Sequence, residues 1–405
     1  NELIMDVSYY NLNARNTTRY TTDSSTMAFS GSIDNTLRPV QHTGIMKIDY
    51  TSRPNDQWNF AAGAKGTLRQ MEDRNQKSFS YHEDILAGYG KVSFTDSPLF
   101  ISAGIRIEKS VSGMPDQFDY SDLALLPSAN ISYQLNKKQN IKLAFRRTVH
   151  RPNIYQLNPT VSANDPFAIH AGNPRLQHES RDEISLTYSL RAAQNYLSGR
   201  LFYNKSSHVF NDLMFVNNNN TLVTEVHNMG GFHRYGLQLN GALKPFNFFS
   251  LNPYFRIYEI ETFTNKMVEQ YDIFQVRDIG YESGLSAVFS LKYGITASMM
   301  FQYNSPKVRM QKVVFEDALY FVGIEKKISK NFRAGIKTAI PFKRSFTYYG
   351  EEVEGKNFYR HSAGDIRMSS FPVWFRLSYS FDSGKTIERI DREKEKVEEL
   401  RDKGF

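Results

Sequence analysis

Two stretches decide the fold: residues 140–149, NIKLAFRRTV, and residues 183–190, EISLTYSL. Apolar and polar side chains alternate in both, and a period of two predicts β-strands with one apolar and one polar face. Between them, residues 150–179 read HRPNIYQLNPTVSANDPFAIHAGNPRLQHE, a connection rich in turn-forming residues and long for a compact domain. The rest of the chain repeats this plan of strand, connection and strand.

Composition narrows the class of protein. The chain has 405 residues, no cysteine, 14% aromatic residues and a net charge of +8. No run of about 18 apolar residues exists, so no membrane-spanning helix is expected, whereas a transmembrane β-strand exposes only alternate residues to lipid. Without cysteine this chain forms no disulfide and no thiolate metal site. The positive charge permits an anionic partner, but no nucleic-acid motif accompanies it, and no nucleic acid is predicted.

Sixteen strands are predicted from the alternation. They lie at about 2–13, 38–52, 58–70, 82–94, 100–109, 122–135, 141–149, 183–190, 196–215, 222–243, 249–263, 274–291, 294–305, 313–328, 332–343 and 370–382. Polar loops are expected after the first strand and around Glu351, Glu352 and Glu354. Connections after even-numbered strands are short and most others are long and polar, as in outer-membrane barrels with periplasmic turns and extracellular loops.

The pattern therefore predicts an all-β fold, a transmembrane antiparallel up-and-down barrel formed by residues 1–385. A soluble sandwich or propeller is the alternative, but its strands would have about 5–6 residues, and these are longer. Residues 386–405 read as a short charged helical tail, expected in the periplasm and outside the barrel wall. Ile105, Phe145, Leu186 and Phe375 are expected to face lipid.

The other face of the predicted strands, which would point into the barrel, carries many charged side chains. Acidic residues share this inward face with basic residues, which are Lys47, Lys65, Arg106, Lys142, Arg146, Arg256, Arg333, Lys337 and Arg376. A lumen with charges of both signs suits a polar filling, either water or a packed domain. Recognition of an anionic or sugar-like solute is one interpretation of these residues. A solvated wall, or salt bridges to a plug domain, is the more common outcome for any single one.

No catalytic constellation is present. Nothing in the sequence matches a nucleophile elbow, a phosphate-binding loop or a zinc-binding helix, so neither enzymatic activity nor a cofactor is predicted. His208, His227 and His233 lie on one predicted hairpin and could meet as metal ligands. Solvated surface histidines are more frequent, and no metal site is predicted.

The long connection carries a resemblance. Its motif residues are Arg151, Pro152, Asn158, Pro159, Gly172, Asn173, Pro174, Leu176 and Glu179. In order and spacing they resemble the connection between two mid-barrel strands of TonB-dependent outer-membrane receptors, most closely the barrel family common in Bacteroidota. His178 stands where that family usually has proline. The stretches 126–128, LPS, and 377–381, LSYSF, are similar to it too.

The resemblance implies a function and partners. Such receptors have about 22 strands around a plug, so the chain would supply the C-terminal strands, with the plug and early strands absent. It would take up a solute too large for porins, in the bacterial outer membrane. Its partners would be membrane lipid, the plug, a TonB-type energy-coupling protein and a surface lipoprotein. A complete 16-stranded diffusion porin and a platform for assembly of an outer-membrane complex are the alternatives.

Closure of the barrel separates these readings. Residues 3–9 would pair with residues 373–381 in a complete porin. In a partial receptor barrel both edges would lack a partner or be filled by other strands, because an open sheet edge does not persist in hydrocarbon. The chain starts without Met or a signal peptide, so we expect a mature or partial chain.

Overall fold

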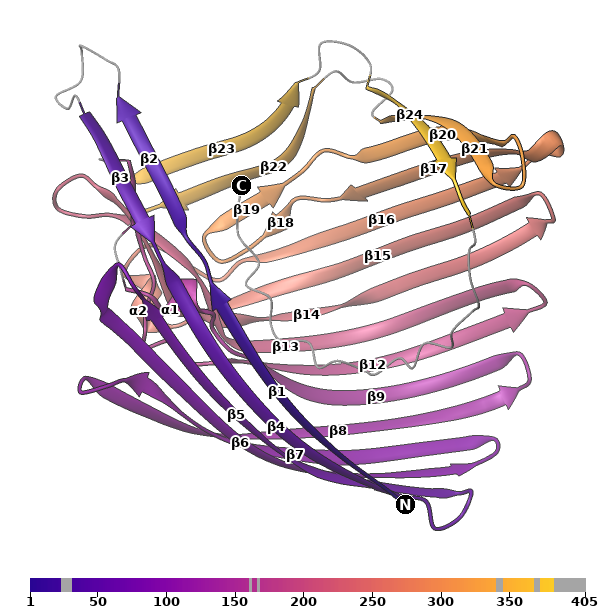
Figure 1. The fold of residues 1–405 in the computed structure, drawn as a ribbon, viewed down its shortest axis with the longest axis horizontal. Helices are drawn as coiled ribbons and strands as arrows, with labels where there is room; N and C mark the ends of the chain where they lie inside the picture. The colour runs from indigo at the N-terminus through magenta and orange to yellow at the C-terminus, as the bar shows by residue number, and fades with distance from the viewer. Residues whose placement is uncertain (23–30, 160–161, 166–167, 340–344, 368–371, 382–405) are drawn as a thin grey trace.

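The computed structural model describes residues 1–22, 31–159, 162–165, 168–339, 345–367 and 372–381. The predicted helical tail, residues 386–405, lies outside this part of the chain. None of the helices in it is long and apolar enough to cross a membrane. Nearly all of the described chain is antiparallel β-structure, and it curls around a hollow (Figure 1).

Sixteen strands follow one another around one curved wall within the described residues. In order they are β1 (Glu2–Asn13), β4 (Pro39–Ser52), β5 (Trp58–Asp73), β6 (Gln76–Asp96), β7 (Leu99–Met114), β8 (Phe118–Asn136), β9 (Gln139–His150), β12 (Glu179–Ala192), β13 (Asn195–Val216), β14 (Leu222–Phe246), β15 (Phe249–Thr264), β16 (Arg277–Ser290), β17 (Ile295–Asn304), β20 (Leu319–Lys327), β21 (Phe332–Ala339) and β24 (Val373–Tyr379). Each pairs antiparallel with the next. The predicted all-β fold, with its long antiparallel strands, is confirmed.

The predicted loops were wrong in three places. The polar segment after the first strand forms a hairpin of β2 (Asn16–Thr22) and β3 (Gly31–Leu37). The acidic loop forms a second hairpin, β22 (Ser345–Gly355) and β23 (Phe358–Arg367). The long connection after β9 contains α1 (Ile154–Leu157), β10 (Ser162–Asp165) and β11 (Ala168–Ala171). Polar composition concealed these strands, because both faces of a protruding hairpin can contact water.

One predicted strand divides in two. Residues 313–328 were expected to form a single wall strand, but β19 (Lys312–Phe315) leaves the wall and β20 begins only at Leu319. With β18 (Lys307–Val308), β22 and β23, β19 forms a separate four-stranded sheet. Asp317 fixes the departure, since its backbone N–H donates to Thr347 O at 2.9 Å and its carboxylate accepts from Thr347 N at 2.9 Å.

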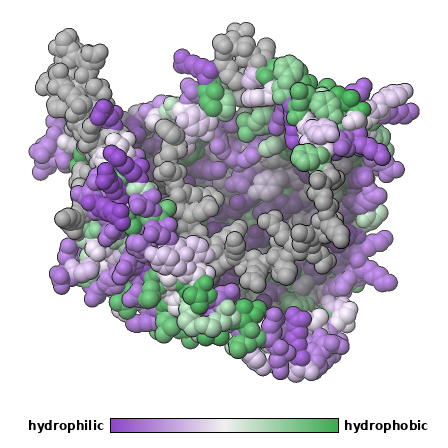
Figure 2. All heavy atoms as spheres, viewed as in Figure 1, coloured by the Kyte–Doolittle hydropathy of each residue, from purple (hydrophilic) through white to green (hydrophobic). Residues whose placement is uncertain are grey.

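The two faces of the wall differ in chemistry. On β7, Ile105 is 46% exposed, whereas Ser102 and Glu108 on the opposite face are buried. Leu186 and Phe375 are likewise exposed, and Phe145 is half-buried. Polar side chains gather in the hollow that the wall encloses (Figure 2). This inverts the pattern of a soluble sheet and is the arrangement expected of a wall whose outer surface contacts hydrocarbon.

An Ile105→Arg variant tests this assignment. Placing a cation in the lipid-facing band near the midplane is expected to cost about 2–4 kcal/mol of unfolding free energy. The measurement is urea unfolding of the protein folded into lipid vesicles, followed by tryptophan fluorescence. The matched control is Ser132→Arg, which puts the same cation on the inner face of β8, where Ser132 donates to Asn140 Oδ1 at 2.8 Å. Equal losses in both variants would contradict the assignment.

The wall has two edges in the described residues. β1 pairs along its whole length with β4, from Glu2 opposite Thr51 to Asn13 opposite Val40. β24 pairs with β21, from Phe332 opposite Tyr379 to Thr338 opposite Val373. No ladder joins β1 to β24 within this part of the chain. Backbone donors and acceptors along both edges therefore need further partners if the sheet lies in hydrocarbon.

Candidate ligand-binding site

The described parts of the long connection, residues 150–159, 162–165 and 168–179, fold onto the inner face of the wall. Asn153 caps α1: its side chain accepts from Gln156 N at 3.0 Å, and the Gln156 side chain accepts from Asn153 N at 3.0 Å. This reciprocal capping box satisfies two backbone donors of a helix that is only four residues long. Ile154 and Leu157 are fully buried on the side of α1 that faces the wall.

The Asn-Pro segment at residues 158–159 and the Gly-Asn-Pro segment at residues 172–174 lie side by side, joined by backbone hydrogen bonds. Gly172 N donates to Asn158 O at 2.9 Å, and Asn173 N donates to Gln156 O at 2.7 Å. A Cβ on Gly172 would meet Asn158 O at 2.5 Å and Gln156 O at 2.6 Å, so only glycine permits this approach. The Asn158 amide donates to Asp73 on β5 at 3.1 Å, and this hydrogen bond attaches the two segments to the wall. Pro159 is exposed, and Pro174 lies in the turn that follows Asn173.

Arg151 ties the start of the connection into a buried ion network. Its guanidinium lies 2.7 Å from Glu108 on β7 and 3.5 Å from Glu83 on β6. Arg69 on β5 donates to Glu83 and contacts Pro152 O at 3.5 Å, while Arg106 donates to Glu108 at 2.5 Å. Glu83 and Glu108 are each 6% exposed. Buried charges paired in this way are costly to separate.

A hydrophobic cluster lies beside this network. Its buried members are Met71, Phe79, Tyr81, Met114, Ile154, Leu157, Leu176, Phe210 and Val226. They come from β5, β6, β7, β13 and β14 as well as from the connection. Leu176 of the motif is therefore a packing residue. Within the described residues, the motif packs an element against the inner face of the wall, and Glu179 is the motif residue that also lines a cavity.

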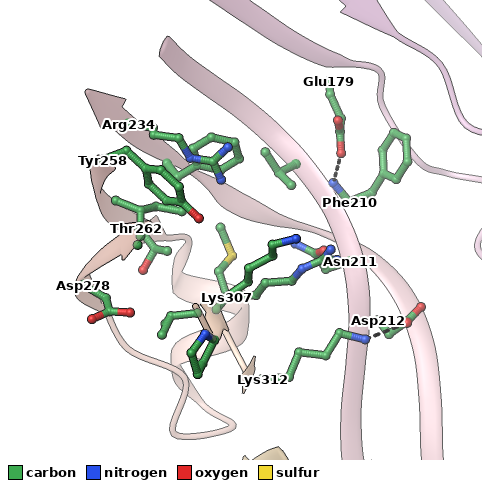
Figure 3. A pocket seen from close by; sticks show the side chains of 18 of the residues that line it. Glu179, Phe210, Asn211, Asp212, Arg234, Tyr258, Thr262, Asp278, Lys307 and Lys312 are labelled. Carbon is green, nitrogen blue, oxygen red and sulfur yellow. Dashed lines mark hydrogen bonds and ion pairs between the residues drawn. The ribbon is translucent and has the colours of Figure 1, made fainter. Parts of the chain in front are cut away.

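A cavity of about 520 Å³ adjoins this element, inside the wall near the ends of β9 and β12 that the long connection joins. Figure 3 shows it from close by. Residues of β9, β12, β13, β14, β15 and β16 form one side, and residues 306–312 of the small sheet form the other. Glu179, the last motif residue, lines it and accepts from Phe210 N at 2.8 Å. The cavity is lined mainly by charged, polar and aromatic side chains, which suits a polar ligand.

Arg234 and Tyr258 stand side by side on the wall side of the cavity (Figure 3). The Arg234 guanidinium carbon lies 4.9 Å from the centroid of the Tyr258 ring and 4.9 Å from that of the Phe232 ring. Gly280 makes room for Tyr258, because a Cβ there would meet the ring at 2.5 Å. Arg234 is opposite Ile260, and Ile260 is opposite Asp278, so this arginine and this acid share one row across three strands.

The small sheet covers the cavity. The Gln311 side chain accepts from Met214 N at 2.8 Å and donates to Met214 O at 2.7 Å, which pairs it with β13 as a strand would. Lys312 lies 3.6 Å from Asp212 of β13 and 3.3 Å from Glu351 of β22. Glu351 is buried and also lies 3.5 Å from Arg360. These contacts hold the sheet of β18, β19, β22 and β23 against the wall.

The ionisation of Glu351 couples this docking to pH. Burial raises its pKa, but the hydrogen bond from Tyr349 at 2.5 Å and the charges of Lys312 and Arg360 outweigh burial and hold the pKa below the ordinary 4.5. Burial, together with that hydrogen bond, raises the pKa of Tyr349 to about 12, so the tyrosine remains a donor. A lowered carboxylate pKa contributes stability above pH 4.5 that is lost as the pH falls through the lowered value.

We therefore expect the small sheet to loosen in acid. Hydrogen exchange of residues 307–315 and 345–367 should accelerate when the pH falls from 7 to below 4.5, after correction for intrinsic rates. A Glu351→Gln variant is the control, because it should exchange faster already at pH 7 and respond less to acid. The expectation is wrong if acid accelerates exchange equally in both proteins.

The predicted inward basic residues do not gather at one site. Arg256 lies 3.6 Å from Glu282 at the cavity, whereas Lys47, Lys65 and Arg106 line a separate hollow of about 410 Å³. Lys142 and Arg146 line a third, of about 500 Å³. Most carry a partner nearby: Asp49 2.8 Å from Lys47, Glu183 3.6 Å from Arg146, Glu325 3.6 Å from Arg333 and the Phe321 ring 4.4 Å from Lys337. Arg376 lies opposite Gly335 on β21.

The three histidines of the predicted hairpin have different surroundings. His233 bonds to the Tyr203 hydroxyl at 2.7 Å, and His227 lies 3.0 Å from Glu225. His208 has a left-handed backbone, with φ of 57°. In the described ranges, no three potential metal ligands come together. His178 lies 3.2 Å from Asp122; burial lowers its pKa, the charges of Arg151 and His208 act the same way, and Asp122 opposes them.

Comparison with known proteins decides the family. The model of the outer membrane protein beta-barrel family matches residues 1–379. The chain belongs to this family. Family membership places it in the outer membrane, in agreement with the apolar outer face of its wall. No protein with a curated function matches the sequence.

Several solved structures share the fold of this family member. The siderophore receptor PirA from Pseudomonas aeruginosa is 14% identical, with 84% of this chain and 61% of that chain covered and a TM-score of 0.59. The FrpB iron transporter from Neisseria meningitidis is 11% identical (93% and 61% covered, TM-score 0.62). The copper transporter OprC is 9% identical (94% and 64% covered, TM-score 0.69). The chain thus spans less than two thirds of the length of these structures.

The sequence analysis did not single out Arg234 and Tyr258, which line the cavity of this family member. Arg234 shares the inward parity of β14 with Gln238, and Tyr258 that of β15 with Arg256, so alternation could have placed both on the inner face. Nothing local shows that the two side chains stack or that residues 306–312 cover them. Glu83 and Glu108 were missed as partners of Arg151 for the same reason.

Proposed function

We propose that this chain forms wall strands of a TonB-dependent outer-membrane receptor that takes up a solute too large for porins. The observation that carries the proposal is the polar cavity of about 520 Å³, which lies partly open inside the wall at the end of the long connections. Membership of the outer membrane barrel family supports it, as does the shared fold with proteins described as receptors and transporters of siderophores, iron and copper. The chain would bind and pass a solute without covalent chemistry.

In this proposal the wall is completed by strands outside this sequence. Two edges, β1 and β24, lack a second neighbour among the described residues, and the chain spans 61% of the PirA structure. Further strands between these edges would bring the wall to about 22. A plug domain would fill the polar hollow, a TonB-type protein would supply energy from the periplasmic side, and a surface lipoprotein could cover the outer end. The end of the wall with long connections would face outward, and β24 would end on the periplasmic side.

The experiment compares solutes removed from the medium by four strains. These are the wild type, a deletion of this protein, a deletion of the TonB-type energy-coupling protein and the double deletion, with mass spectrometry of the spent medium. The proposal expects one set of solutes to persist in all three deletion strains. Solutes whose removal needs this protein but not the coupling protein would indicate a diffusion porin. No solute difference, with loss of other envelope proteins from purified membranes, would indicate an assembly platform.

A further inference from the structure

We propose that the cavity binds the carboxylate or phosphate group of an anionic ligand through Arg234, with the ligand's flat or apolar part against Tyr258 and Phe232. This inference names the class of solute for the proposed receptor and so rests on that function. Arg234 lines the cavity from β14, between two aromatic rings that each lie 4.9 Å from its guanidinium carbon.

Among the described residues, Arg234 forms no ion pair with an acid, unlike its neighbours Arg200 and Arg256. Its Nε is buried without a hydrogen bond, and within the described residues its side chain forms no ion pair. Arg200 and Arg256 both lie over the ring of Phe202. However, Arg200 donates to Glu183, and Arg256 lies 3.6 Å from Glu282. A buried donor without an acceptor is costly, and an anion in the cavity would give the guanidinium charge-assisted hydrogen bonds.

Ion pairs already occupy part of the charge that lines the cavity. Of its four acids, Asp212 lies 3.6 Å from Lys312, and Glu282 lies 3.6 Å from Arg256, which is outside the lining. This leaves Glu179 and Asp278 against three cations, which are Arg234 on the wall side and, from the small sheet, Arg309 and Lys307.

Lys307 and Arg309 interact only weakly with the other described residues. Lys307 has only a 3.9 Å approach to Glu316, and the Arg309 side chain forms no hydrogen bond or ion pair with any described residue. The cavity therefore presents cations from two opposed surfaces, and its volume of about 520 Å³ admits a small organic anion. The aromatic rings beside Arg234 add a flat apolar surface, so a planar anion fits better than a bare one.

The test uses the full-length receptor, with the strands that complete its wall, in lipid nanodiscs; 4-fluorobenzoate is the probe and its ¹⁹F linewidth is the readout. We expect saturable broadening that inorganic phosphate reverses by competition. 4-Fluorobenzyl alcohol, which has nearly the same shape without charge, should broaden far less. An equal effect of the alcohol, or no competition by phosphate, would overturn the inference.

Arg234→Gln should weaken probe binding at least roughly tenfold, which corresponds to the loss of a charged hydrogen bond. The matched control is Arg200→Gln. It removes an arginine that lies over the Phe202 ring and already donates to Glu183, so this variant should bind the probe like the wild type. Both variants are first checked for heat-modifiable migration on gels, and if Arg234→Gln does not fold, the alcohol and phosphate comparisons on the wild type still decide. Wild-type affinity in Arg234→Gln would overturn the inference.

The two proposals can fail separately. Energy-dependent solute removal by cells without probe binding would overturn the anion site and leave the receptor function standing. Probe binding without energy-dependent removal would overturn the receptor function while the anion site remains.

Discussion

A Glu83→Gln variant is expected to lose about 3–5 kcal/mol of unfolding free energy. Glu83 is 6% exposed and is the acceptor for Arg69, which is itself buried, and it lies 3.5 Å from Arg151. Removing its charge leaves three guanidinium groups, those of Arg69, Arg106 and Arg151, with Glu108 as the remaining acid of the network. The amide replaces the carboxylate at almost the same volume, so the loss reports charge pairing and not a cavity.

Urea unfolding of the protein in lipid vesicles measures this loss. The matched control is Glu72→Gln, one strand away on β5, where the partner Arg74 lies 3.7 Å off and both side chains are more than half exposed. An exposed pair contributes about 0–1 kcal/mol, so this control should remain close to the wild type. Similar losses in the two variants would show that the buried network does not hold the long connection in place.

Phe79→Ala should cost about 3–5 kcal/mol, because it empties a fully buried site in the cluster beneath the long connection. Phe79 packs in the cluster that contains Ile154, Leu157 and Leu176, so the loss should appear first as faster hydrogen exchange of residues 150–159 and 172–178. The unfolding free energy comes from the same urea experiment.

Phe274→Ala is the control for size and chemistry, since Phe274 is 60% exposed in the connection before β16. That substitution should change stability by no more than about 0.5 kcal/mol. If Phe79→Ala lowers global stability while exchange in residues 150–178 stays unchanged, the cluster supports the wall and not the connection.

The amino-acid sequence by itself determined most strands of the wall and the faces of those strands. The predicted first strand, residues 2–13, coincides with β1, and the long pair 196–215 and 222–243 corresponds to β13 and β14 within a few residues. Alternation also places Ile105 and Arg106 on opposite faces. Such features are local, because side chains point to opposite sides of a strand whatever the strand pairs with, and lipid outside a polar interior imposes the alternation at every position.

Only the tertiary structure decided which inward residues meet. Arg151 finds Glu83 and Glu108 from positions 68 and 43 residues distant in sequence, and Gln311 pairs with Met214 at a separation of 97. The departure of β19 from the wall, and with it the roof over Arg234, likewise depends on a contact between Asp317 and Thr347. A period of two fixes the side of the sheet on which a residue lies, but curvature and the inward fold of the long connections fix its neighbours. That is why the motif around Arg151 could be recognised in advance while Arg234 and its cavity could not.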